Sequence, residues 1–414
     1  MKKILLSIAL AVGSLTVAHG LTLEECIEMA RENYPAIKQY DLITASSGYD
    51  VSNASKAWLP KISVQAGAYG FTDILDSESI ISQMGVDIDN YVVSGNVTVK
   101  QTVYDGGQIA AGKRIAEAKS AVEARQTDVT LYSVKERVQE IFFGILLIDE
   151  QLKQNDILQK DLNVSCKTVE EMMSGGIANQ TDLDAISVEL LNARQQRDAY
   201  DASRTAYLKM LGTFIGKDLD SSTTLEKPAM TTATAGDASL RPEMSLFSSQ
   251  DDMLEAQRRQ INSSLLPTVG FMGMGMIHTK VSDMVNKGML LGGLTLSWNV
   301  GALYTRKNDL NKLDAKRQQN DVSRQTFLFQ NQLQQQEADG TVTAMRKQLE
   351  SDDEIVKLRE NIRSKADRKV AAGTESVNDL VRDINAVSRA RSQRALHEVQ
   401  LLKAVYKLNN LNGN

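Results

Sequence analysis

One stretch of helix-favouring sequence constrains this chain more than any other feature. It begins after the Tyr-Asp-Gly-Gly turn at residues 104–107 and continues without a proline to the Ser-Gly-Gly interruption at residues 174–176, a run of about 67 residues. At about 1.5 Å per residue, a helix of this length is roughly 100 Å long. Such a rod is too long to wrap around a compact core, so we expect it to lie against other long helices.

Part of this stretch has apolar residues with strict three-four spacing. They are Leu131, Val134, Val138, Ile141, Ile145, Ile148 and Leu152. A period of 3.5 residues is typical of a coiled-coil seam and indicates left-handed supercoiling. The sequence therefore predicts long helices packed side by side.

Composition excludes some classes of protein. The chain has 414 residues, 42% of them hydrophobic and 24% charged, so it is long enough for two or more domains and is not disordered overall. The net charge is −5, and we find no basic patch with interleaved aromatic residues. Both observations argue against a general nucleic-acid-binding protein.

The N-terminus has the pattern of a secretory signal peptide, which we place at residues 1–20. Lys2 and Lys3 precede an apolar run to Ala18, and small residues favour cleavage before Leu21. A retained anchor helix is the alternative. No cysteine lies at the cleavage point, so we do not expect a lipid anchor, and whether Cys26 and Cys166 pair stays open.

The sequence predicts two structural repeats. The first, residues 21–220, reads as a helix, strands 61–72 and 91–103, a long helix, a tight turn and a second helix. A linker at 221–240 precedes the second repeat, residues 241–414, with strands 268–277 and 289–300. Leu59-Pro60 and Leu266-Pro267 end the first helix of each repeat, because the residue before a proline avoids the helical region.

Matched residues support this repeat. Pro35 and Pro242 differ by 207 positions, as do Pro60 and Pro267. From the second strand onward the shift is 197 and stays constant, which places a ten-residue deletion in the loop between the two strands. It relates Gly176 to Gly373, Asp182 to Asp379 and Arg197 to Arg394. A constant register over about a hundred residues predicts long helices of equal length in the two repeats.

The predicted strands alternate between apolar and polar residues. Leu290, Leu294 and Leu296 lie on one face, with Thr295 and Ser297 opposite. This pattern, in strands of about ten to thirteen residues, is typical of a transmembrane β-barrel. Outside the signal peptide no segment has 18 consecutive apolar residues. If the chain is inserted in a membrane, its β-strands must therefore cross the bilayer. Four strands cannot close a barrel, so we expect an oligomer that shares one.

The arrangement resembles the TolC family of outer-membrane efflux proteins across the whole mature chain. The resemblance rests on a set of motifs in order. They are Leu-Thr-Leu-Glu-Glu at 21–25, the breaks at Pro60 and Pro267, the turn of Asp105, Gly106 and Gly107, Leu-Thr-Leu-Ser-Trp ending at Trp298, and the paired Gly-x5-Asp-Leu turns at 176 and 373.

This resemblance implies a mainly α-helical protein with a β-barrel part. Three chains would form an α-helical barrel of long coiled-coil hairpins and a shared twelve-stranded transmembrane barrel, four strands from each chain. It implies an outer-membrane exit duct of a tripartite efflux or type I secretion system, with a periplasmic adaptor and an inner-membrane pump as partners. Small-molecule efflux ranks above protein secretion.

The resemblance also implies roles for residues near the two helical turns. Candidate adaptor-docking residues are Gly175, Gly176, Ile177, Gly373 and Thr374, although the glycines also read as helix C-caps. Candidate periplasmic gate residues are Thr181, Asp182, Asp379, Arg382 and Asp383. The sequence departs from the family at Arg382, where a second acidic residue is typical, and at Glu375, where a basic residue is typical. Asp379 is alternatively a structural carboxylate at a helix N-terminus.

No constellation of residues predicts catalysis, a cofactor or a His-based metal site. Of the three histidines, His19 leaves with the signal peptide, and only His278 and His397 remain. Met272, Met274 and Met276 alternate along one strand and indicate either a soft-metal track for copper export or ordinary apolar barrel surface. The alternative function is a structural periplasmic coiled coil or adhesin stalk without a pore.

Overall fold

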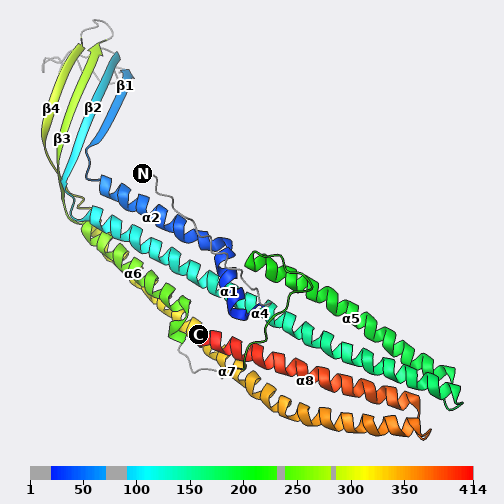
Figure 1. Ribbon diagram of the computed structural model, residues 1–414. Coiled ribbons are helices and arrows are strands. Elements are labelled where there is room, and N and C mark those ends of the chain that lie inside the picture. Colours follow the sequence, from blue (N-terminus) through cyan, green and yellow to red (C-terminus); the bar gives the residue numbers. More distant parts are fainter. Residues whose placement is uncertain (1–19, 71–90, 231–237, 281–285, 414) are drawn as a thin grey trace, which may run out of the picture. The chain divides into compact units, whose positions relative to one another are not determined.

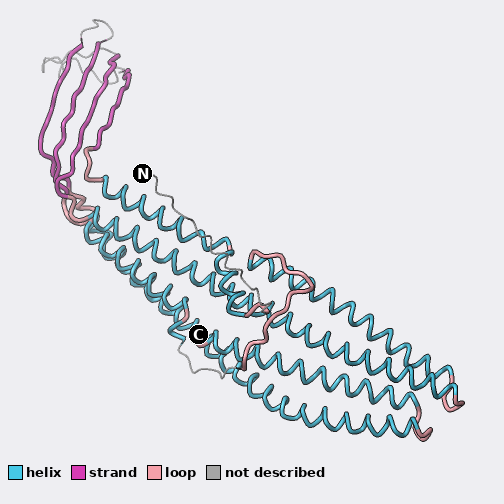
Figure 2. Tube along the Cα trace, in the orientation of Figure 1, coloured by secondary structure: helices cyan, strands magenta, loops and turns pink. Residues whose placement is uncertain are grey.

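The computed structural model describes residues 20–70, 91–230, 238–280 and 286–413. The predicted signal peptide up to residue 19 and the loop between the first two strands lie outside these residues. The described chain is mainly helical with one four-stranded antiparallel sheet, as Figures 1 and 2 show. Its described residues divide into two compact units, residues 20–37, 128–230, 238–241 and 327–413 in one and residues 38–70, 91–127, 242–280 and 286–326 in the other.

The helices and strands occur in the predicted order. The helices are α1 (Leu23–Asn33), η1 (Pro35–Lys38), α2 (Gln39–Lys56), α4 (Gln108–Ser174), α5 (Gln180–Ile215), η3 (Ala238–Leu240), α6 (Pro242–Ser263), α7 (Ala302–Ala371) and α8 (Val377–Leu411). The strands are β1 (Lys61–Gly70), β2 (Tyr91–Tyr104), β3 (Thr268–Lys280) and β4 (Asn286–Ser297). The long helices α4 and α7 contain 67 and 70 residues, so the length predicted for the first is confirmed.

Four strand ends within the described residues differ from the predicted bounds. Strand β2 ends at Tyr104 rather than at residue 103, and β4 begins at Asn286 rather than at residue 289. Strand β3 extends three residues further than expected, to Lys280. Strand β4 ends at Ser297 rather than at residue 300. Two hydrogen bonds explain its early end. The indole Nε1 of Trp298 donates a hydrogen bond of 3.0 Å to the main-chain oxygen of Leu265, and the amide of Val300 donates to the main-chain oxygen of Trp298.

The four strands form a sheet in the order β1-β2-β3-β4 (Figure 1). Directly opposed residues of antiparallel strands point to the same side, so the register assigns every strand residue to a face. Ile62 pairs with Val99 and Val64 with Val97, while Phe271 pairs with Leu294. The apolar face also carries Ile277, Leu290 and Leu296, all largely exposed in the single chain. The predicted alternation is therefore confirmed.

Matching contacts join the end of each strand pair to the helix before it. The side-chain Nε2 of Gln101 donates to the main-chain oxygen of Trp58 at 2.5 Å, and Trp298 makes the corresponding bond to Leu265. Gln101 and Trp298 are 197 positions apart, and Trp58 and Leu265 are 207 positions apart. Both bonds thus join positions that the proposed repeat treats as equivalent.

The turn between β2 and α4 depends on Asp105, Gly106 and Gly107. Asp105 is buried, and its carboxylate accepts hydrogen bonds from the amides of Gly107 (2.9 Å) and Ile109 (2.6 Å). Gly106 has φ +68°, and a Cβ there would lie 2.6 Å from the Cβ of Leu266. A side chain at position 106 would therefore be strained by both the backbone and the neighbouring Leu-Pro segment.

The other unit has a continuous apolar core. Six of the seven predicted seam residues are buried, and Leu152 is partly buried. Val138, Ile141 and Phe142 of α4 pack with residues of α1, α5 and α8. The α1 helix begins with the predicted capping box between Thr22 and Glu25.

The two cysteines are free in this structure. Cys26 is fully buried in the core, where desolvation and then the neighbouring Glu25 carboxylate raise the pKa of its thiol to about 12. Cys166 is partly buried and packs against a second apolar cluster near the helical turns.

Candidate functional site: the two helix-hairpin tips

The two short turns that join α4 to α5 and α7 to α8 are built alike (Figure 2). Gly176 has φ +74° and Gly373 has φ +70°. The amides of Ile177 and Thr374 each donate at 2.9 Å to the carbonyl five residues earlier, and the two glycine amides donate to the carbonyl three residues earlier. This is the Schellman arrangement, which glycine adopts without strain. The C-cap interpretation of both glycines is therefore confirmed.

A side-chain cap follows each glycine by three residues. Asn179 and Asp182 form a capping box at the start of α5, with reciprocal bonds of 3.2 and 3.0 Å. At the start of α8, Ser376 accepts the amide of Asp379 at 3.2 Å and donates its hydroxyl to the Asp379 carboxylate at 2.7 Å. Asp182 and Asp379, two of the three predicted gate aspartates, thus stabilise the first turn of a helix.

The charges at the second tip are paired locally. The Arg382 guanidinium lies 3.1 Å from the Asp379 carboxylate, one helical turn earlier. Glu375 lies 3.4 Å from the ammonium of Lys369. Asp383 is buried, whereas Arg382 is exposed. The structure therefore brings Asp379 and Arg382 together and separates Asp383 from solvent.

The first tip is less charged and more accessible. Thr181 is exposed and Asp182 is partly buried in its capping box. Ile177 is 59% exposed although it is a large aliphatic residue. A Cβ placed on Gly373 would lie 3.7 Å from the Cγ2 of Ile177, so the two tips are close together. Ile177, Gly373 and Thr374 thus present a small, partly apolar surface.

A shared apolar cluster fixes the tips behind this surface. Val169 of α4, Ile186 of α5, Val370 of α7 and Leu380 and Ile384 of α8 are all buried in it. The cluster contains residues from all four helices of the two hairpins. Burial of several aliphatic side chains, each worth about 1.5–3 kcal/mol, gives the tips a rigid base.

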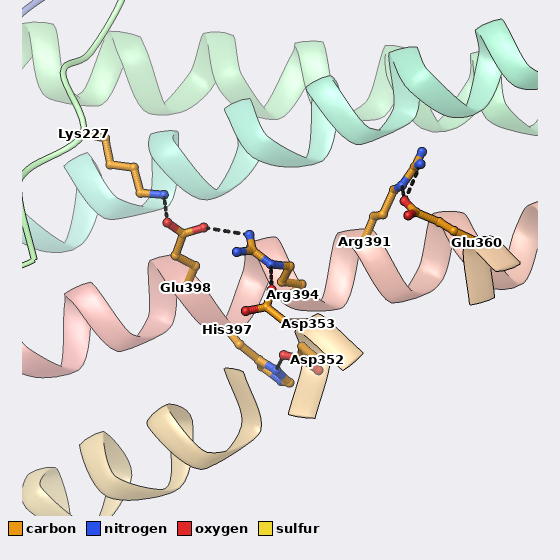
Figure 3. A network of polar contacts seen from close by, with 8 residues as sticks. All are labelled: Lys227, Asp352, Asp353, Glu360, Arg391, Arg394, His397 and Glu398. Carbon is orange, nitrogen blue, oxygen red and sulfur yellow. Dashed lines mark hydrogen bonds and ion pairs between the residues drawn. The ribbon is translucent and has the colours of Figure 1, made fainter. Parts of the chain in front are cut away.

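A polar network lies further along α7 and α8 (Figure 3). Arg394 reaches Asp353 at 2.5 Å and Glu398 at 3.4 Å, and Glu398 reaches Lys227 of the linker at 2.7 Å. The hydrogen bond that Arg394 donates to the Asp353 carboxylate is the main reason that the pKa of the guanidinium is raised. The network holds α7, α8 and the residue 221–230 segment together.

The ion pair of Arg394 has a counterpart in the first hairpin, where Arg197 pairs with Asp156. Arg197 precedes Arg394 by 197 positions, and Asp156 precedes Asp353 by the same number. Sequence analysis matched the two arginines but missed their partners. A search for acidic residues at equivalent positions of the long helices would have found them.

Two other kinds of feature are absent from the part of the chain that the structure describes. Among the described residues, no helix is both long and apolar enough to cross a membrane. Within the same ranges, no group of three or more His, Cys, Asp or Glu residues is arranged to hold a metal ion.

Comparison with solved structures shows that the chain shares its fold with several known proteins. The solved structure of the outer-membrane channel OprN aligns with a TM-score of 0.73 and 15% identity, over 94% of this chain and 89% of that chain. The outer membrane protein VceC from Vibrio cholerae aligns with a TM-score of 0.69 and 12% identity, over 95% and 96% of the two chains. The open state of the Neisseria gonorrhoeae MtrE outer membrane channel gives 0.70 and 13%, over 95% and 89%.

Sequence comparison agrees with the structural one. Residues 26–217 match the family described as outer membrane efflux protein. No curated protein matches the chain. The resemblance to the TolC family of outer-membrane efflux proteins, predicted from the sequence motifs, is thereby confirmed.

Proposed function

We propose that this chain is one subunit of a passive, trimeric export channel in the bacterial outer membrane. The observation that carries the proposal is the sheet, which has one apolar and one polar face and is attached to two long helical hairpins. The apolar face would contact lipid and the polar face would line an aqueous lumen. The chain contributes the duct and performs no bond chemistry.

Strand edges support an oligomer. Within the described residues β1 pairs only with β2, and β4 only with β3. Each chain therefore has two open edges with unpaired backbone groups, which a membrane does not tolerate. Three chains joined edge to edge would give twelve strands and close the barrel.

Apolar residues on α7 support the same assembly. Ile355, Leu358 and Ile362 follow the three-four spacing of a coiled-coil seam, and they are 46%, 54% and 46% exposed in the single chain. Packing against a neighbouring copy would remove this surface from water. By contrast, the α4 seam from Leu131 to Ile148 is buried in the core of its own chain.

The tips would serve as the periplasmic contact surface. Their rigid base and the exposed Ile177 beside Gly373 suit docking of a periplasmic adaptor protein, which would link the channel to an inner-membrane pump. Asp379 and Arg382, with Thr181, Asp182 and Asp383 nearby, would form the gate. A signal peptide at residues 1–20 would direct the chain to the envelope. We favour efflux of small molecules over protein secretion.

Purified mature protein tests the proposal directly. We expect a trimer by native mass spectrometry and stepwise ion conductance after reconstitution into a planar lipid bilayer. A trimer that gives no conductance would favour the alternative, a structural coiled coil or adhesin stalk. A monomer without conductance would exclude both the shared barrel and the channel.

A further inference from the structure

The methionines of β3 lie on the polar face of the sheet. Met272 pairs with Lys100, Met274 with Thr98 and Met276 with Asn96. Because opposed residues share a face, the three methionines lie with these polar residues and with Leu291 of β4, which is directly opposed to Met274. Ile62, Val64, Leu290, Leu294 and Leu296 lie on the opposite face. The interpretation of these methionines as ordinary apolar barrel surface is therefore wrong.

A fourth methionine joins them from the neighbouring strand. Met289 of β4 is directly opposed to Met276, and its side chain is 51% exposed. Directly opposed Cβ atoms are about 4.5–5.5 Å apart, and diagonal neighbours such as Met274 and Met289 are about 7–8 Å apart. A methionine side chain has three rotatable bonds, so the sulfur atoms of these three residues can converge.

Apart from Leu291, which is directly opposed to Met274, the neighbours of these thioethers on this face are mainly polar. Gln65, Asn96, Met276 and Met289 form one row across the sheet, and Ser63 and Thr98 belong to the next. Asn96 Oδ1 is shielded from solvent and receives no hydrogen bond from the described residues. A polar face with four thioethers and an unsatisfied amide oxygen is better suited to a ligand than to an apolar contact.

Thioether sulfur is a soft ligand. It selects Cu(I), or Ag(I) as its close chemical analogue, over hard ions such as Mg²⁺ and Ca²⁺. We propose that Met274, Met276 and Met289 bind a soft monovalent metal ion and that Met272 extends the track along β3. Placing this track inside a pore rests on the proposed function, whereas metal binding by the four residues does not.

Silver binding to the purified full chain in detergent tests the site. Isothermal titration with Ag⁺ in chloride-free buffer would compare the parent protein with a Met276→Leu, Met289→Leu double variant. Leucine keeps the apolar volume and removes the sulfur. All proteins would carry Cys166→Ser, because a partly exposed thiol competes for silver, whereas Cys26 is buried.

We expect the double variant to lose one silver site per chain or to bind it at least about tenfold more weakly. The matched control is Met210→Leu, which removes an exposed thioether of α5 and should leave the isotherm unchanged. Equal isotherms for parent and double variant, or an equal loss in the control, would overturn the proposal.

Two further measurements keep the outcome clear. Native mass spectrometry checks whether the double variant assembles. If it does not, the single variant Met274→Leu replaces it in the silver titration. Conductance of the same samples distinguishes the two proposals. If the channel conducts and the variants bind silver as the parent does, the metal site is contradicted and the channel is not. If silver binding depends on the methionines but the protein does not conduct, the channel is contradicted and the metal site is not.

Discussion

The long helices α4 and α7 are similar in length but differ in what covers them. The middle of α4 is buried by α1, α5 and α8, with Val138, Ile141 and Phe142 in the core. On α7, by contrast, Ile355, Leu358 and Ile362 stay exposed in the single chain. Both helices contribute to the core of their own chain, since Val342 and Val370 of α7 are also buried. The difference teaches that α7 in addition leaves an apolar stripe uncovered, which a neighbouring subunit would cover in the proposed trimer.

The largest expected effect is the loss of a core side chain from α4. Phe142 is fully buried and makes an edge-to-face contact with Phe143 at a centroid distance of 6.1 Å. We expect Phe142→Ala to destabilise the fold by about 3–5 kcal/mol, because it removes apolar burial and leaves a cavity. Chemical denaturation followed by circular dichroism measures this. A loss below about 1 kcal/mol would mean that α4 is not the centre of the core.

Substitution on α7 should affect assembly rather than the fold. We expect Leu358→Ser to weaken the trimer by about 1–2 kcal/mol per subunit and to leave the secondary structure unchanged. Native mass spectrometry over a range of dilutions measures this. Lys357→Ser, an exposed neighbour on another side of the helix, is the control. If both variants dissociate equally, the α7 stripe is not the subunit contact.

The two strand-to-helix turns extend the comparison. In the first turn the carboxylate of Asp105 caps α4. In the second turn the main-chain oxygens of Trp298 and Asn299 accept the hydrogen bonds instead. We expect Asp105→Ala to cost about 1 kcal/mol and Asn299→Ala to cost much less. Thermal unfolding of both variants checks this, and equal shifts would show that the first turn does not depend on its cap.

The tips differ in charge, so the same substitution should act differently at each. The Arg382 guanidinium next to Asp379 partly neutralises its carboxylate. We therefore expect Asp379→Asn to lower the cation preference of the reconstituted channel and Arg382→Gln to raise it, by a few-fold at most. Asp182→Asn makes the same change at the first tip for comparison. Unchanged selectivity in both second-tip variants would remove this pair from the pore.

Much of this architecture could be predicted from local pattern. The heptad spacing identified the buried side of α4, and two-residue alternation identified the strands, because both periods follow directly from backbone geometry. Gly176 and Gly373 were identified as turns because a positive φ favours glycine. The same alternation assigned Leu290, Leu294 and Leu296 of β4 to one face of their strand.

Other features depend on contacts between distant segments. The methionines of β3 could not be assigned to the polar face until the register with β2 was known, since a shift of one residue moves every side chain to the opposite face. The early end of β4 depends on a bond from Trp298 to Leu265, 33 residues away. The pairing of Asp379 with Arg382 was within reach, because residues three apart on a helix are neighbours.

The smallest expected difference concerns the repeat-related ion pairs of Arg197 and Arg394. Both arginines are about 40% exposed, so water weakens each pair, and an isolated pair contributes about 0.2–1 kcal/mol. Arg394 also contacts Glu398, which in turn holds Lys227 (Figure 3). We therefore expect Arg394→Gln to destabilise the fold slightly more than Arg197→Gln. The difference in unfolding free energy should shrink in about 1 M salt, where the screening length falls to about 3 Å. A difference that persists at high salt would come from packing of the arginine stem instead, and the network would not be stabilising the second hairpin through charge.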